Sequence, residues 1–387
     1  MYIYDLKKYR NNGFALLGLL IISIPFSFYS VIENQSISFF TLIQVILILS
    51  LVNIGKEKKQ MNIVLLLLPM LTVIILFVFL YFQSSYHTYL TDGFIKIMIF
   101  LLPLYAVIRT INLSDKHILY LIQLFIGTAF ISGLMVLIQF TASTFYGITD
   151  WGLQIEFAAR KGFAGLFYDF SIMSVFMAGT SVILTISFFN RKPIFKYRID
   201  ILLSFCFLCF SALTSARSGL VAFFITLCLF FLIERKAGAL IMSLLLAIPV
   251  GTIILYVFSL TERTFHLNDP GRLDHYSNAI NFFLENPIWG SKILGYYELT
   301  GQTRVHNFII DFLVEYGAII TIVLLMLFFM FVMKGFKRCP ILAYLLLAFS
   351  IGGLFHASFI NTHYIVVPLY LISSMSPLPN SRQRLQS

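Results

Sequence analysis

The sequence is poor in charged residues, which make up only 11% of its 387 positions, whereas hydrophobic residues make up 59%. A soluble core of this length does not require so much apolar surface, so the expected solvent is the lipid bilayer. Acidic residues are the scarcer kind, with 17 Asp and Glu against 27 Lys and Arg. In a membrane protein this excess indicates basic cytoplasmic loops rather than a nucleic-acid partner.

Cysteine and the common catalytic signatures are also scarce or missing. Cys206 and Cys209 have the spacing of a redox pair, but their apolar surroundings favour small helix residues over a redox or metal role. The sequence has no Asp-x-Asp, no nucleotide-binding P-loop, no glycine-rich dinucleotide motif, no zinc-ligand spacing and no Gly-x-Ser-x-Gly. It therefore predicts neither a metal nor a cofactor.

Apolar runs of membrane-spanning length follow one another along the whole chain. They occur near 14–33, 36–54, 61–82, 93–108, 117–141, 170–189, 199–215, 218–233, 238–259, 307–333, 341–356 and 360–376. About twelve spans of this kind predict an all-α integral membrane protein. No segment between them is long enough for a soluble domain, so residues 1–387 are expected to form one polytopic membrane domain.

The basic residues predict which way these spans point. Most of them lie in the segments that an even number of spans places on the same side as both termini. This bias predicts that these segments and both termini are cytoplasmic. The two longer loops, 142–169 and 260–305, then face outward, where arginine is least expected. Arg263, Arg272 and Arg304 of the second loop thereby become candidates for holding an anionic substrate.

Two polar clusters lie at the outer ends of predicted spans. Arg160 and Lys161 are followed by two glycines, so that backbone N–H groups and cations could approach a phosphate together, although a flexible basic loop is the alternative. Arg217 lies in a break between two apolar helices that is too short for a solvated loop. A guanidinium there favours an anionic partner, with lipid phosphate as the alternative to a substrate.

A third cluster follows the Pro-Gly turn at 270–271. Apolar residues at helical spacing predict a short amphipathic helix on the membrane surface, which Pro287 ends. Arg272, at the start of this helix, is expected to point into the space between the surface helix and the bundle. A surface ion pair with Asp269 or Asp274 is the alternative.

A fourth cluster lies at the start of the span predicted for 307–333. The helix dipole there disfavours a protonated His306, so that the neutral imidazole is usable as a base or acceptor. Asn307, Asp311 and Glu315 follow at four-residue spacing and share one helix face. Acidic residues within an apolar run are expected to face the bundle interior or a cavity. A structural histidine is the alternative.

Taken in order, these motifs resemble the O-antigen ligase and polymerase superfamily, bacterial membrane glycosyltransferases that use polyprenyl-diphosphate-linked glycans. The resemblance covers roughly residues 155–335, including the outer loop 260–305. Its motifs are Arg160 with Gly162 and Gly165, Ala216-Arg217-Ser218-Gly219, Arg272, Pro287-Ile-Trp-Gly290, His306-Asn307 and Glu315-Tyr-Gly317. Alanine precedes Arg217 where serine is usual, and Ser291 follows Gly290 where a second glycine is frequent.

The resemblance implies a GT-C-type membrane fold and metal-independent glycosyl transfer at the periplasmic face of the bacterial inner membrane. It implies that Arg217 and Arg272, helped by Arg160, bind the donor diphosphate and stabilise the leaving group. His306 would orient or deprotonate the acceptor hydroxyl. The candidate catalytic residues are His306, Arg217 and Arg272, and the candidate substrate-binding residues are Arg160, Asn307, Glu315 and Arg304.

These implications favour an O-antigen or capsular polysaccharide polymerase. Its donor would be an oligosaccharide linked to a polyprenyl diphosphate such as undecaprenyl diphosphate, and its acceptor another glycan repeat unit. An O-antigen ligase that moves finished glycan to a lipid A core is the alternative, because both reactions take the same donor. A flippase or secondary transporter is a third hypothesis, which the lack of internal repeats weakens. A flippase and a chain-length regulator are the candidate protein partners, beside the lipid bilayer.

Overall fold

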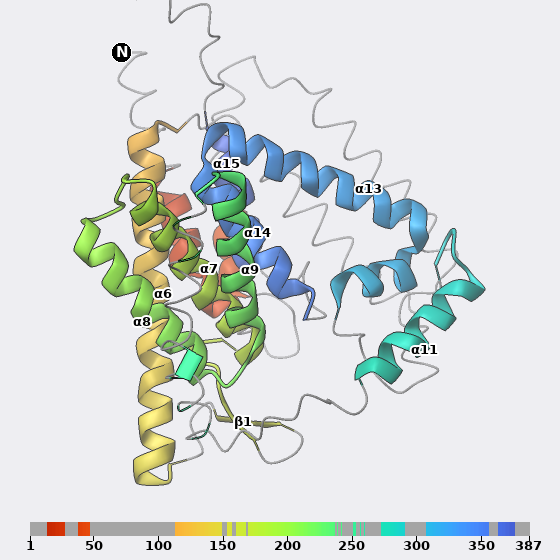
Figure 1. Cartoon of the computed structure of the whole chain (residues 1–387), viewed down its shortest axis with the longest axis horizontal. Coiled ribbons are helices and arrows are strands. Elements are labelled where there is room, and N and C mark those ends of the chain that lie inside the picture. Colours follow the sequence, from red (N-terminus) through yellow and green to blue (C-terminus); the bar gives the residue numbers. More distant parts are fainter. Residues whose placement is uncertain are drawn as a thin grey trace, which may run out of the picture.

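The structure is a computed structural model of the whole chain. It describes residues 14–27, 38–46, 113–148, 153–156, 160–167, 169–236, 272–290, 307–355 and 363–375, with a few isolated helical positions between 238 and 259. Most of these residues are helical, and Figure 1 shows the helices gathered into a bundle from which one long helix extends to the side.

The helices in chain order are α6 (Asp115–Tyr146), α7 (Phe170–Phe189), α8 (Tyr197–Leu213), α9 (Ser218–Ile233), α11 (Arg272–Glu285), α13 (Phe308–Arg338), α14 (Pro340–Gly353) and α15 (His363–Ser374). Residues 14–22 and 39–46 are also helical, and the 3-10 turn η1 (Ile24–Phe26) follows the first of them. Among the described helices, α6, α7 and α13 are long and apolar enough to cross a membrane.

The predicted spans can be compared with these helices. Those near 117–141, 170–189, 199–215, 218–233, 307–333, 341–356 and 360–376 each coincide with one described helix. The spans predicted at 61–82 and 93–108 lie outside the described residues, as do parts of 14–33, 36–54 and 238–259. A mostly helical chain with apolar helices is therefore confirmed. The number of twelve spans and the GT-C type stay predictions.

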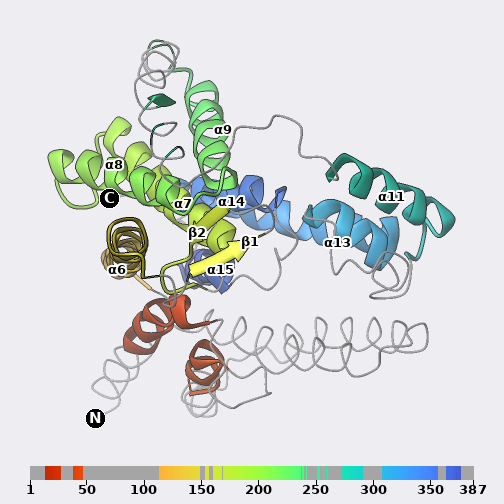
Figure 2. The ribbon, with the colours of Figure 1, turned by 90° about the horizontal axis from the view of Figure 1, so that it is seen from below.

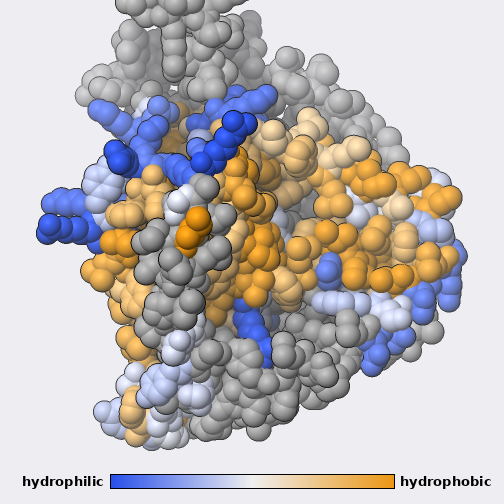
Figure 3. All heavy atoms as spheres, viewed as in Figure 1, coloured by the Kyte–Doolittle hydropathy of each residue, from blue (hydrophilic) through white to orange (hydrophobic). Residues whose placement is uncertain are grey.

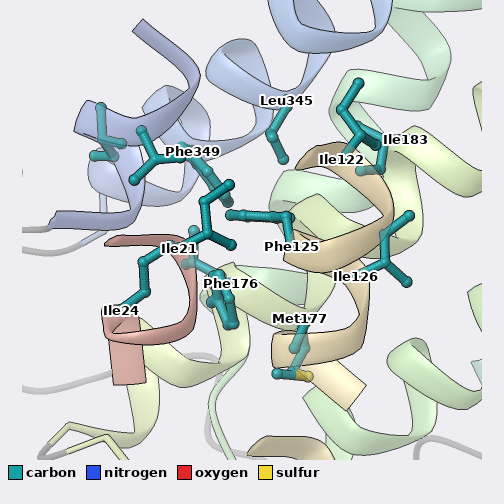
Figure 4. Packing of buried hydrophobic residues seen from close by; sticks show 14 of the residues in the cluster. Ile21, Ile24, Ile122, Phe125, Ile126, Phe176, Met177, Ile183, Leu345 and Phe349 are labelled. Carbon is teal, nitrogen blue, oxygen red and sulfur yellow. The ribbon is translucent and has the colours of Figure 1, made fainter. Parts of the chain in front are cut away.

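Helix α7 lies at the centre of the described bundle, between α8, α9 and α14. It is apolar around its whole circumference and almost entirely buried, as expected for a helix surrounded by others. Figure 4 shows Phe176 of α7 near Phe125 of α6 and Phe349 of α14. The Phe125 and Phe176 rings meet edge to face, with centroids 5.1 Å apart. Gly179 lets the Phe349 ring approach, because a Cβ there would lie 2.3 Å from a ring carbon.

Hydroxyl groups join α7 to α8 inside the bundle. The Ser181 and Ser204 Oγ atoms lie 2.8 Å apart, and Thr185 Oγ1 lies 2.6 Å from the same Ser204 Oγ. Nearer the other end of α7, the Ser174 and Ser211 Oγ atoms are also 2.8 Å apart. Small polar side chains of this kind let membrane helices pack closely and hydrogen-bond across their interface. They hold α8 along α7.

A short β-hairpin interrupts the otherwise helical fold that was predicted. Strands β1 (Leu153–Glu156) and β2 (Arg160–Phe163) are antiparallel, with Leu153 opposite Phe163 and Glu156 opposite Arg160. The Phe163 side chain is buried against Phe140 of α6, with ring centroids 5.7 Å apart. The backbone groups next to the buried Phe163 are paired between the two strands, whereas a flexible loop would leave them to solvent.

Helix α13 corrects the prediction of one continuous span over 307–333. Gly317 has φ 74° and ψ 175°, which breaks the helix into a short first segment and a long second segment. The long segment extends away from the bundle and carries exposed apolar side chains such as Ile322, Met326 and Phe329. The short segment lies beside α11. Figure 2 shows the short segment and α11 on the side of the molecule opposite α8.

The bundle has two chemically different ends. At one, here called the basic end, the Lys236 Nζ after α9 donates to Asn190 Oδ1 after α7 at 2.6 Å. Gln123 of α6 donates to Ile194 O at the same end, at 2.8 Å. Figure 3 shows hydrophilic residues above the hydrophobic middle of the molecule and further hydrophilic residues below it. The hairpin and the α8–α9 turn lie at the opposite end, here called the hairpin end.

Candidate functional site

Arg217 lies in the short turn that joins α8 to α9 at the hairpin end. The turn is held by hydrogen bonds: Ala216 N donates to Thr214 Oγ1 at 3.3 Å, and Ser174 Oγ of α7 donates to Ala216 O at 3.2 Å. Ser215 has φ 66°, a left-handed conformation that is uncommon for a residue with a side chain. Such a conformation persists where the surrounding contacts determine it. The backbone that carries Arg217 is therefore fixed.

The structure explains why position 219, in the predicted Arg-Ser-Gly motif, is a glycine. A Cβ at Gly219 would lie 2.3 Å from Ser174 O, so the first turn of α9 packs directly on the α7 backbone. The N-terminus of α9 thereby reaches the hairpin end with Arg217 immediately before it. Backbone N–H groups at a helix N-terminus attract anions, and Arg217, a half-buried residue, adds a full positive charge. This arrangement can bind an oxyanion.

Two buried hydroxyls flank Arg217. Ser215 is 0% exposed and Ser218 is 8% exposed, and within the described part of the chain neither hydroxyl oxygen has a hydrogen-bond partner. A buried polar group left without a partner costs about 1–3 kcal/mol, so it is rare in a purely structural turn. The two serines are further candidates for binding an oxyanion. In the sequence they stand out only as members of the short polar break.

The structure brings the first two predicted clusters together. Ala164, Phe170 and Ala216 form one buried apolar cluster, so the residues after β2 contact the turn that carries Arg217. Gly162 lies against the same aromatic ring, because a Cβ there would be 2.8 Å from Phe170 Cδ1. The backbone of Arg160 therefore belongs to a strand rather than to the expected loop, and the residues that follow this strand contact the Arg217 turn.

Gln139 of α6 holds the end of this strand, and sequence reasoning missed it. The Gly165 N–H donates to Gln139 Oε1 at 2.8 Å, and Gln139 Nε2 donates back to Gly165 O at 3.0 Å. Gly165 has φ 62°, and a Cβ there would lie 2.8 Å from Ser132 O. The signal that could have found Gln139 is its type, because an amide inside an apolar span requires a hydrogen-bond partner.

Asn307 begins α13 as a helix cap. Its Oδ1 accepts from Ile309 N at 3.0 Å and from Ile310 N at 3.2 Å. The Asn307 oxygen is therefore engaged with the backbone, and a role of this residue in substrate binding stays a prediction. Asp169 caps α7 in the same way, accepting from two backbone N–H groups.

The acidic residues of α13 lie as the four-residue spacing predicted. Asp311 is buried and Glu315, one turn later, is half-buried. Phe308 and Phe312 of the same short segment join the main hydrophobic core of the bundle. The segment that carries these two carboxylates is therefore anchored in the hydrophobic core.

The predicted surface helix is present as α11. It begins at Arg272 and ends at Glu285, immediately before the Asn-Pro pair. Its apolar face packs on the first segment of α13, where Ala279 and Val314 are buried together. The predicted boundaries of this helix are confirmed.

The remaining site predictions lie outside what the structure describes. His306 and Arg304 precede the described part of α13, and the side chains of Arg160 and Arg272 are likewise not described. Their roles stay predictions. Within the described residues, no group of three or more His, Cys, Asp or Glu side chains could hold a metal ion.

Comparison with known proteins agrees with the motifs. Residues 202–325, about a third of the chain, match the family model described as O-antigen ligase. The matched region contains most of α8, the Arg217 turn, α9, α11 and the first segment of α13. The curated proteins that were searched contain no match to the chain. This match supports the resemblance of the chain, over residues 202–325, to the O-antigen ligase and polymerase superfamily.

Proposed function

We propose that this protein polymerises O-antigen or capsular polysaccharide from repeat units carried on a polyprenyl diphosphate. The observation that carries the proposal is the match of residues 202–325 to the O-antigen ligase family. That region contains the fixed turn with Arg217 and the helix that begins at Arg272. Both arginines belong to elements whose positions the fold determines.

The donor diphosphate would bind at the hairpin end. Arg217, the N-terminus of α9 and the hydroxyls of Ser215 and Ser218 offer positive charge and hydrogen-bond donors in one place. Arg160 enters from the neighbouring hairpin, and Arg272 would complete the site from α11. Preorganised donors of this kind stabilise the charge that develops on a leaving group.

In the proposed reaction, a hydroxyl oxygen of the acceptor glycan attacks the anomeric carbon of the lipid-linked glycan. The new glycosidic C–O bond forms as the bond from that carbon to the diphosphate oxygen breaks. The polyprenyl diphosphate leaves with the electron pair, and His306 accepts the hydroxyl proton. Glu315, on the first segment of α13, which follows His306 in the chain, would support the histidine. The energy comes from the diphosphate leaving group, so the proposed reaction does not require ATP. The arginines would neutralise the diphosphate charge in place of a metal.

The proposed location is the periplasmic face of the bacterial inner membrane, with both termini cytoplasmic. The separation of the basic end from the hairpin end supports this orientation, because lysine and arginine accumulate on the cytoplasmic side of membrane proteins. A flippase that delivers the lipid-linked repeat unit and a chain-length regulator are the proposed protein partners.

The second candidate is an O-antigen ligase, which the description of the matching family model favours. The two reactions share the donor and differ in the acceptor. Deleting the protein from its host separates them by gel analysis of the surface glycan. Single repeat units on the lipid A core indicate a lost polymerase, and long chains left on the carrier lipid indicate a lost ligase. Loss of carrier-linked repeat units from the outer face would instead indicate a flippase.

A reconstituted assay tests the proposed residues. Purified protein is incubated with lipid-diphosphate-linked repeat units, and chain length is measured by gel electrophoresis. We expect wild-type protein to elongate the glycan and the Arg272→Ala and His306→Ala variants not to do so, although both elute as folded, monodisperse protein. Normal elongation by either variant would overturn the catalytic assignment.

A further inference from the structure

Two glycines from distant parts of the sequence meet backbone to backbone. Gly290 follows α11 and Gly317 breaks α13, with φ values of 76° and 74°. A Cβ on Gly290 would lie 2.5 Å from Gly317 N, and a Cβ on Gly317 would lie 2.3 Å from Ile288 O. Real Cβ atoms essentially never approach other heavy atoms this closely. Each position therefore requires glycine for its conformation and, independently, for the contact.

Hydrogen bonds complete this junction. The break at Gly317 interrupts the helical ladder of α13, and Ala318 N donates instead to Pro287 O at 2.9 Å. The turn that supplies this carbonyl is closed by Gly290 N, which donates to Asn286 O at 2.9 Å. The break in α13 and the turn after α11 thus satisfy each other's backbone groups.

The junction lies at the end of a narrow helix–helix contact. Helix α11 packs chiefly on the first segment of α13, where Ala279 and Val314 are fully buried and Tyr276 and Phe283 pack around them. The opposite face of α11 is exposed, including Leu284 at 62%. In Figure 2, α11 lies at the edge of the molecule, far from α6 and α8. In the part of the chain that the structure describes, a small apolar patch accompanies the backbone junction in holding α11.

We propose that Gly290 and Gly317 are positioning residues that dock α11 at one register along the first segment of α13. Through this docking they set where Arg272, at the start of α11, stands relative to Asn307 at the start of α13. The docking stands on the contacts above, whereas its consequence for catalysis rests on the proposed function.

Cysteine cross-linking tests the docking directly. In full-length protein in detergent, the four native cysteines Cys206, Cys209, Cys228 and Cys339 are replaced by alanine, and Ala279→Cys and Val314→Cys are introduced. We expect the pair to cross-link readily under mild oxidation. Adding Gly317→Ala or Gly290→Ala should slow cross-linking about tenfold or more, because about 1.4 kcal/mol of lost docking energy corresponds to a factor of ten.

Gly147→Ala is the matched control. Gly147 has φ 65° at the end of α6, but a Cβ there would meet nothing within 4 Å. This variant carries the conformational cost of a left-handed alanine without the steric conflict, and should cross-link at the unmodified rate. Cross-linking at that rate in both junction variants would overturn the proposal, as would equal slowing by Gly147→Ala.

A second variant preserves both glycines. Ala318→Pro removes the N–H that bonds Pro287 O, at the first position of the second α13 segment, where proline is compatible with a helix. We expect slower cross-linking with unchanged helix content by circular dichroism, and an unchanged rate would contradict the role of the junction.

Elongation assays then connect docking to catalysis. We expect Gly317→Ala to lose elongation and to regain it once the cross-link between the introduced cysteines has formed, which a globally misfolded protein would not do. A cross-linked variant that stays inactive would overturn the positioning role. If the junction variants cross-link slowly but deletion of the protein leaves the surface glycan unchanged, the proposed function is wrong and the docking proposal still holds.

Discussion

The turn between α7 and α8, at the basic end, differs from the turn between α8 and α9, at the hairpin end, in how its polar groups are satisfied. At the basic end, Asp200 is fully buried and accepts from Ile194 N at 2.8 Å and Phe195 N at 3.0 Å. The Ser187 hydroxyl donates to the same carboxylate at 3.4 Å. The buried carboxylate thus ties the turn to both helices.

At the hairpin end, the buried hydroxyls of Ser215 and Ser218 have no hydrogen-bond partner among the described residues. Backbone strain does not separate the two turns, because Arg191 at the basic end and Ser215 both have positive φ, 54° and 66°. The two turns differ instead in whether their buried polar groups have hydrogen-bond partners. A satisfied turn contributes stability, whereas a rigid turn that keeps donors available can bind a ligand.

The largest effect is expected for Arg217→Ala. Removing one preorganised donor to a developing oxyanion lowers turnover by about 10²–10³-fold, so we expect a loss of this size in the elongation rate. The thermal unfolding midpoint in detergent should change little. Arg191→Ala is the control, since Arg191 is an exposed, positive-φ arginine at the basic end. Equal losses in both variants would show that the two turns do not differ in function.

Asp200→Ala is expected to produce the largest loss of stability. Hydrogen bonds to charged groups contribute about 1.5–3 kcal/mol each, and this variant removes the acceptor of two backbone N–H groups. We expect the free energy of unfolding to fall by about 3 kcal/mol, measured by denaturant titration in micelles. Elongation per folded molecule should be unchanged. A selective loss of elongation at normal stability would reverse the roles of the two ends.

Two glutamines of α6 allow a matched comparison. Gln139→Met removes both hydrogen bonds to Gly165 at the hairpin end, and Gln123→Met removes the bond to Ile194 O at the basic end. We expect Gln139→Met to raise the KM for the lipid-linked donor roughly tenfold, about 1.4 kcal/mol, with a smaller change in kcat. Gln123→Met should change stability alone. The same KM in both variants would exclude a positioning role for Gln139.

The smallest loss of stability is expected for Ser218→Ala. This variant loses no hydrogen bond of the Ser218 hydroxyl and removes a buried hydroxyl without a partner among the described residues, which costs about 1–3 kcal/mol, so the free energy of unfolding should stay the same or rise. Ser204→Ala is the comparison, because it removes the hydroxyl contacts to Ser181 and Thr185 and should cost about 1–2 kcal/mol. Chemical denaturation of both variants measures the difference. A larger loss in Ser218→Ala would mean that its hydroxyl is structurally engaged.

The boundaries of several helices follow from sequence alone. The predicted spans 170–189 and 218–233 coincide with α7 and α9, because each is an uninterrupted apolar run between polar residues. The start and end of α11 follow from a Pro-Gly turn and an Asn-Pro pair. These signals are local, so no distant contact is required to interpret them.

The hairpin and the break in α13 could not be predicted in this way. Strand β2 is held by Phe140 and Gln139 of α6, and Gly317 adopts its conformation against the turn that contains Gly290. Both depend on residues that lie far away along the chain. Gln139 was missed for the same reason, since its partner becomes apparent only when α6 and the hairpin are side by side.

Sequence alone determined that this is a helical membrane protein with its polar motifs in the order of the O-antigen ligase and polymerase superfamily. Hydropathy and motif order are properties of the sequence of residues, so they can be determined without knowing how the helices pack. Only the tertiary structure decided that the residue after the Arg160 strand contacts the Arg217 turn and that Gly290 meets Gly317. These contacts join distant residues, and their close approach depends on how whole helices pack.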